Sequence, residues 1–286
     1  MKTVPDMTSY IKNLIKANGM RSAVNRAFRY TVIDTPLERL PSEKIPISII
    51  YHWFEIRSQL FPRVSDKNPL DLVWLNPAKI EYLHPPGYPR PPDRYGYVIG
   101  GDWDKKRISF DNHFIHESLV DRYKNNKKWE RTELYQRCIS SKQDEVAPRE
   151  LSTPKELDKY LHKIDSLYDS IEKDGYKTQQ QLISENPYQT QQQNNDACHP
   201  ILNEICVNIG RNGELIKRGS GHHRLSIAKI LNIDKVPVIV KTRHKKWQHL
   251  RNMIMNTGST DEPNVELKKH SNHPDLKDII SSTNDD

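Results

Sequence analysis

Residues 218–240 have the sequence Arg218-Gly-Ser-Gly-His-His-Arg-Leu-Ser-Ile-Ala-Lys-Ile-Leu-Asn-Ile-Asp-Lys-Val-Pro-Val-Ile-Val240. Two glycines near the start, Gly219 and Gly221, permit a sharp turn and a close approach of the backbone to a ligand. The apolar residues that follow recur at helical spacing and predict a helix that begins near His223. The β-branched run 236–240 then predicts a buried strand, with its proline at the strand start or at a sheet edge. The predicted order is glycine loop, helix, turn and strand.

The glycine loop leads into the N-terminus of the predicted helix. At that end of a helix, unpaired backbone N–H groups and the helix dipole favour an anion. Cationic and imidazole side chains in the same stretch add further hydrogen-bond donors. The expected phosphate-binding residues are therefore Arg218, Gly219, Ser220, Gly221, His222, His223 and Arg224. A histidine packed in the core is the alternative interpretation for either imidazole.

The motif Gly221-His222-His223-Arg224, together with the helix and strand that follow it, resembles the signature of the ParB/sulfiredoxin superfamily. The stretch Leu167-Tyr-Asp-Ser-Ile-Glu-Lys-Asp-Gly-Tyr176 is similar to a helix of that superfamily, which precedes the strand before the loop. The resemblance covers residues 160–245 and reaches back to residues 73–80, which resemble the opening strand. It implies an α+β fold with a small mixed sheet flanked by helices.

The branches of this superfamily differ in the residues around the loop. Sulfiredoxins have a reactive cysteine directly after the loop glycine, where this chain has His222. ParB proteins have Gly-Glu-Arg-Arg and a following helix-turn-helix domain, for which the weakly patterned stretch after residue 250 is not expected to suffice. The ADP-dependent free serine kinases have Asp-Gly-His-His-Arg. Residues 221–224 match this third branch best, although Ser220 replaces its acid.

The resemblance to the kinase branch implies a phosphotransferase that binds ATP or ADP with Mg²⁺ and acts on a small hydroxyl-bearing acceptor. Phosphoryl transfer needs cations and N–H donors around the phosphate, a metal ion and a base. The loop supplies the donors, and His222 is a candidate catalytic residue. Two alternatives stay open, namely a nucleotide-dependent DNA- or partner-binding protein of the ParB kind and a ParB-like nuclease.

The stretch Tyr97-Val-Ile-Gly-Gly-Asp-Trp-Asp104 predicts a strand that ends in a glycine turn with two carboxylates, a common arrangement in site loops. Asp102 and Asp104 are the candidate ligands of Mg²⁺ and, with Glu81, the candidate catalytic bases. This interpretation requires both carboxylates to face the glycine loop. The alternative is a hydrogen-bonded turn with Trp103 anchored in the core.

The predicted nucleotide-binding domain spans residues 70–250. Within it, a helix is expected from Pro154 to the C-terminal glycine Gly175. The glutamine-rich stretch 177–196 is expected to be a flexible insert.

Two further segments flank this domain. Residues 1–69 are interpreted as an N-terminal extension, with a basic amphipathic helix over residues 8–30 and a strand at Ile45–Tyr51. Residues 251–286 are expected to form a partly disordered polar tail with one short turn around Leu276.

The formal net charge of +7 over 286 residues permits anionic partners without requiring nucleic acid. The basic segment Lys241–Arg251 is the candidate nucleic-acid surface, with Trp247 stacking on a base; the alternative docks this tryptophan inward. No apolar run approaches the ~18 residues of a membrane span, and no signal-type apolar core is present. Three cysteines without metal-ligand spacing favour reduced thiols, so we expect a cytoplasmic protein.

Overall fold

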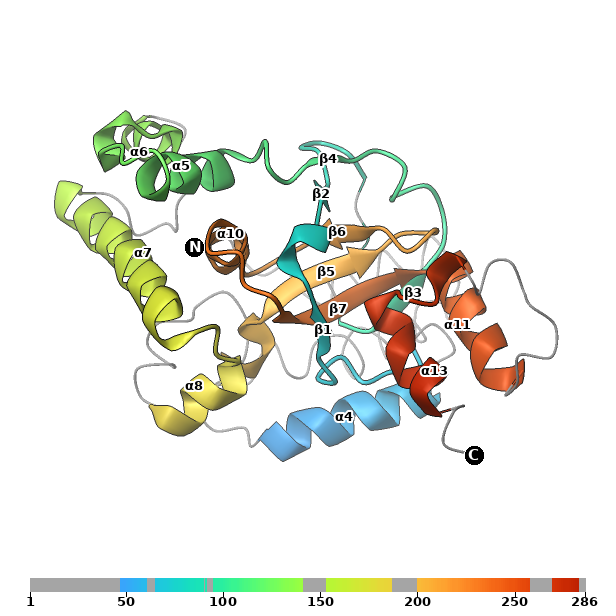
Figure 1. Ribbon diagram of the computed structural model, residues 1–286. Helices are drawn as coiled ribbons and strands as arrows, with labels where there is room; N and C mark the ends of the chain where they lie inside the picture. The colour runs from blue at the N-terminus through green and yellow to red at the C-terminus, as the bar shows by residue number, and fades with distance from the viewer. Residues whose placement is uncertain are drawn as a thin grey trace, which may run out of the picture.

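A mixed, seven-stranded sheet lies at the centre of the molecule, with helices on both of its faces (Figure 1). The computed structural model describes residues 47–60, 65–89, 91, 95–140, 153–186, 200–257 and 269–282. Within these ranges the sheet is flanked by eight α-helices, and none of them is long and apolar enough to cross a membrane. The fold is therefore α+β, as the sequence predicts.

The strands are ordered β1-β7-β5-β6-β2-β4, and β3 also pairs with β7. Their bounds are Val73–Leu75 (β1), Tyr82–Leu83 (β2), Tyr97–Ile99 (β3), Ile108–Ser109 (β4), Ile205–Ile209 (β5), Leu215–Lys217 (β6) and Val236–His244 (β7). All nine residues of β7 are buried, as expected of a central strand. β1 pairs with the first half of β7 and β3 with the second half, whereas β5 lies along the other edge of β7.

The helices are α4 (Ile47–Leu60), α5 (Phe114–Tyr123), α6 (Glu133–Ile139), α7 (Pro154–Asp174), α8 (Gln179–Glu185), α10 (His222–Ile230), α11 (Lys245–Thr257) and α13 (Lys277–Ser282). Short 3₁₀ helices lie at Pro77–Lys79 (η3), Trp129–Arg131 (η4), Pro200–Asn203 (η6) and Pro274–Leu276 (η7). Helices α10, α11 and α13 pack on one face of the sheet, and α5, α6 and α7 pack outside α10. This packing places the loop before α10 between the sheet and the outer helices.

Helix α4 covers the other face of the sheet, where a strand at Ile45–Tyr51 was the expectation. That expectation is wrong from residue 47 onward, because Ile50 and Phe54, four residues apart, are both buried against Cys206 and Ile239 of the sheet. Short apolar runs fit a strand or a buried helix equally well, and tertiary packing decides between them. The helix predicted over residues 8–30 lies outside the described residues.

Helix α7 confirms the prediction for residues 154–174. Thr153 caps it in a reciprocal capping box with Glu156, Pro154 occupies its first turn, and Gly175 ends it with φ 77°.

The first part of the glutamine-rich stretch is a helix, where a flexible insert was the expectation. Residues 179–185 form helix α8, which begins with a second capping box between Thr178 and Gln181. Residues 187–199 lie outside the described ranges.

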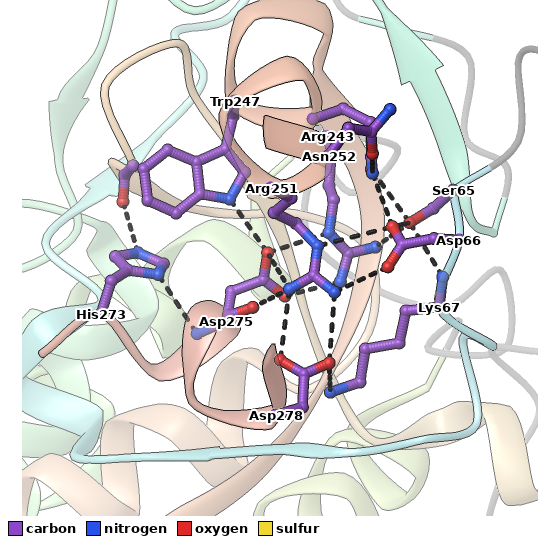
Figure 2. A network of polar contacts seen from close by, with 12 residues as sticks. Ser65, Asp66, Lys67, Arg243, Trp247, Arg251, Asn252, His273, Asp275 and Asp278 are labelled. Atoms are coloured by element: carbon purple, nitrogen blue, oxygen red, sulfur yellow. Dashed lines mark hydrogen bonds and ion pairs between the residues drawn. The ribbon is translucent and has the colours of Figure 1, made fainter. Parts of the chain in front are cut away.

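The expected polar tail is wrong for residues 269–282, which pack on the core. Leu276 is buried in the turn predicted around it, and Asp275 is buried beside it. Figure 2 shows why this segment docks, because Asp275 receives hydrogen bonds from Arg243 of β7 (2.6 and 2.9 Å) and from the Trp247 indole of α11 (2.9 Å). Arg251 of α11 adds ion pairs to Asp66 (2.8 Å) and Asp278 (3.2 Å).

Candidate functional site

The glycine loop joins the end of β6 to the start of α10 and lies against the beginning of β5. Gly219 and Gly221 both have positive φ values, 65° and 91°, which favour glycine. A Cβ atom added to Gly221 would lie 2.9 Å from the Ile205 Cα atom, so the loop backbone packs directly on β5. Gly221 is the N-cap residue of α10 and makes no side-chain cap, which leaves the first-turn N–H groups of this helix without an intrahelical acceptor.

A buried lysine holds the loop in shape from beneath. The Lys217 Nζ atom donates hydrogen bonds to three successive carbonyl oxygens, those of Arg218 (3.3 Å), Gly219 (2.9 Å) and Ser220 (2.5 Å). The loop carbonyls therefore gather around one ammonium group. This arrangement turns the negative ends of these peptide groups inward and places a positive charge next to the helix N-terminus.

Two imidazoles stack beside the loop. His222, the first residue of α10, lies 5.1 Å from His113 between ring centroids, and Phe110 stacks on both rings. Burial, followed by the nearby Lys217 ammonium, lowers the pKa of His113 to about 4 and holds the pKa of His222 well below its usual value. Both rings are therefore neutral at pH 7 and can donate or accept a hydrogen bond there.

His223 points away from His222, toward α7, where its Nε2 atom lies 2.9 Å from the Tyr160 hydroxyl. The two histidines therefore face different sides of the helix start. Arg224 also turns inward, with its Nη1 atom 3.5 Å from the buried Glu204 carboxylate. The Ser220 hydroxyl donates to the Glu204 carbonyl (3.1 Å). The side chains of His223, Arg224 and Ser220 are thus engaged by Tyr160 or Glu204, and they do not fit the expected role of phosphate ligands.

Glu204 precedes β5 and joins the loop to α8. Its carboxylate accepts a hydrogen bond from the Gln179 backbone N–H and faces Arg224. Burial raises the pKa of Glu204 from 4.5 to about 7, although the Arg224 guanidinium opposes the change. The folded protein therefore retains this proton at pH values where an unfolded chain has released it.

We expect the protein to lose stability as pH rises through 7. A raised carboxyl pKa gives a contribution that is fully present below pH 4.5 and is lost above about 7, and this interval corresponds to about 3 kcal/mol of unfolding free energy. Urea unfolding at pH 5 and pH 8 measures the difference. Glu204→Gln should remove most of it, whereas Glu117→Gln, at an exposed position of α5, should leave it unchanged. The same pH dependence in both variants would disprove this role of Glu204.

Asp102 and Asp104 do not face the glycine loop. Asp104 is buried and bound by Arg211, which also contacts Asp102 at the turn between β5 and β6. Gly221 contacts the opposite end of β5, four residue steps of about 3.3 Å away, or about 13 Å. The expected juxtaposition is wrong. Arg211 pairs with both acids, and Lys105 also pairs with Asp102 (3.0 Å), in a structural turn whose Trp103 is buried in the core.

The two acids therefore do not fit a magnesium site at the loop, and we derive no step through a metal ion. Within the described ranges, no three histidine, cysteine or carboxylate side chains gather into a metal-binding group.

The segment Lys241–Arg251 does not present the expected nucleic-acid surface. Trp247 and Arg251 are completely buried, and Lys241 and Arg243 are also buried. Only Lys245, Lys246 and His249 of this segment are exposed. Trp247 instead packs on His270 and His273, which confirms the alternative interpretation that it docks inward.

Three residues of this site belong to no motif that the sequence analysis singled out. They are Lys217, the last residue of a buried strand, His113, the N-cap residue of α5, and Glu204, which lies just before β5. Two signals were available in the sequence. Lys217 ends an otherwise apolar strand, and Glu204 stands next to another apolar strand. Only the close contact between α5 and α10 brings His113 to the loop.

The chain was compared with known protein families, curated proteins and solved structures, and none of the three gave a match.

Proposed function

We propose that this protein binds the phosphate groups of a nucleotide, ATP or ADP, at the glycine loop. The single observation that carries the proposal is that the Lys217 ammonium donates hydrogen bonds to all three loop carbonyls. With these carbonyls turned toward the lysine, the loop and the uncapped N-terminus of α10 offer N–H groups and positive potential to an anion. His222 and His113 supply further donors at the same place.

Phosphoryl transfer to a small hydroxyl-bearing acceptor is the activity that the resemblance to the free serine kinases supports. In this proposal the N–H groups of the loop and of α10 bind the transferred phosphate, the Lys217 charge beneath them adds positive potential, and neutral His222 or His113 accepts the proton of the acceptor hydroxyl. His222 thus remains the catalytic candidate, whereas Asp102 and Asp104 do not. Burial of Trp247 and Arg251 gives the DNA-binding alternative less support.

Replacement of His222 with alanine tests the proposal. We expect ATP or ADP to bind the unaltered protein in calorimetric titrations and to raise its melting temperature, because a ligand of the folded state must do so. His222→Ala should weaken binding about tenfold or more, since a hydrogen bond to a charged group contributes about 1.5–3 kcal/mol. The matched control is His249→Ala, at an exposed histidine of α11 outside the site.

Circular dichroism and the melting temperature without ligand separate loss of binding from loss of fold. Equal nucleotide affinity in the two variants would contradict the assignment of His222. Phosphorus NMR with serine as the first acceptor then tests transfer separately. Nucleotide binding without any phosphomonoester product, for serine or a wider panel of hydroxyl compounds, would support a binding protein instead of a kinase.

A further inference from the structure

A concave site includes His116, one of the side chains that contact the Phe110 ring. The Phe110 ring centroid is 6.4 Å from that of His222 and 5.4 Å from that of His116. His116 lines a pocket of about 350 Å³ between η3, α5 and the end of α10. This volume is near the lower limit of about 300 Å³ for small-molecule sites, so an occupant must be small.

Part of the pocket wall is apolar. Val120 comes from α5, Ile230 from the end of α10 and Ile233 from the turn that follows, while Pro77 and Ala78 of η3 lie on the remaining side. Asn232 holds this turn with a φ of 52° and a backbone hydrogen bond to the Lys229 carbonyl (3.2 Å). The apolar side chains therefore belong to rigid elements and form a preformed surface for a hydrophobic group.

The charged groups of the pocket carry an excess of one positive charge. Lys229 and Lys124 both line it, and Asp111 is the single carboxylate among the lining residues. Lys229 is largely buried and pairs with Asp111 at 2.8 Å, but Asp111 itself is 62% exposed. Burial lowers the pKa of His116, so this ring adds no charge at pH 7. The Lys229 ammonium also lies over the Phe110 ring, 5.1 Å from its centroid, but its one carboxylate partner is solvated. A largely buried ammonium in this situation favours a second anion.

We propose that this pocket binds a small organic anion, that is, one carboxylate or similar group joined to an apolar body. The anionic group pairs with Lys229 and Lys124, and the apolar body packs on Val120, Ile230 and Ile233. This site is separate from the glycine loop, and its occupation does not depend on the nucleotide-binding proposal.

Three probes of similar size, together with the smaller inorganic phosphate, test the two halves of this proposal with the full chain. Benzoate has both the charge and the ring, benzamide has the same shape without the charge, benzylammonium reverses the charge, and inorganic phosphate lacks the apolar body. Methyl NMR follows Val120, Ile230 and Ile233 during each titration. We expect benzoate to shift these three methyl signals, but not those of Ile205 beneath the glycine loop, and to bind at least tenfold more tightly than the other probes.

Two variants locate the binding. Lys229→Met should weaken benzoate binding about tenfold, which corresponds to ~1.4 kcal/mol, and Val120→Phe should abolish it by filling the pocket. Lys128→Met is the control, because Lys128 is exposed and does not line the pocket. Equal affinity for benzoate and benzamide, preference for benzylammonium, or no shift up to millimolar benzoate would each overturn the proposal. Full benzoate affinity in folded Val120→Phe protein would overturn it as well.

Discussion

Replacing Asp275 with alanine should lower the free energy of unfolding by about 3–5 kcal/mol. Asp275 is completely buried between Arg243 and Arg251, two guanidinium groups that are buried as well. Burial alone would raise the pKa of Asp275, but Arg243 and Arg251 outweigh it and hold the pKa far below its usual range. Removal of the carboxylate leaves two buried cations with less compensation, and an uncompensated buried charge has a cost of this size.

Urea unfolding measures the effect, with Asp278→Ala as the matched control. Asp278 pairs with Arg251 and Lys67 in the same network, but its side chain is 36% exposed, so its loss should cost less than about 1 kcal/mol. Similar losses in the two variants would mean that the network gains little from burial. A folded Asp275→Ala protein with unchanged stability would contradict the docking role that we assign to the Asp275 contacts drawn in Figure 2.

Replacing Gly221 with alanine should destabilise the protein by about 3 kcal/mol and disorganise the glycine loop. Part of the cost is conformational, because an L-residue in the left-handed region costs about 1–2 kcal/mol. The remainder is steric, because the new Cβ atom would lie 2.9 Å from the Ile205 Cα atom, and the backbone of a buried central strand cannot move aside cheaply.

Gly101→Ala separates these two costs. Gly101 has nearly the same φ as Gly221, 94° against 91°, but a Cβ atom there would meet no atom within 4 Å. Gly101→Ala should therefore lower the free energy of unfolding only by the conformational part. Chemical denaturation of both variants gives the difference, for which we expect about 1–2 kcal/mol. Equal losses would show that the loop does not depend on its close contact with β5.

Short-range sequence patterns were sufficient to predict several helices and strands. Helix α7 could be predicted from the residues at its two ends, because Thr153, Pro154 and Gly175 act within one turn of the helix that they begin or end. The glycine loop, α10 and β7 followed from spacing and β-branched residues in one continuous stretch. The apolar run that became α4 shows the limit of such signals, since a few apolar residues carry no clear period.

The roles of charged residues required the tertiary structure. Arg243 and Arg251 belong to a segment whose composition indicated a solvated or nucleic-acid surface, yet Asp275, 32 residues beyond Arg243, binds both of them in the core. Asp102 and Asp104 looked like metal ligands because nothing local showed that Arg211, more than 100 residues later, would pair with both of them. Charge pairs form between segments that the fold brings together.

By itself, the sequence determined the glycine loop, the helix and strand that follow it, and the α+β class, because glycine conformation, helix capping and strand composition act over a few neighbouring residues. Only the tertiary structure decided that Lys217 collects the loop carbonyls, that His113 stacks on His222, and that Asp104 lies at the far end of β5. The physical reason is that hydrogen bonds, ring contacts and ion pairs depend on distances of a few ångströms between residues far apart in the chain.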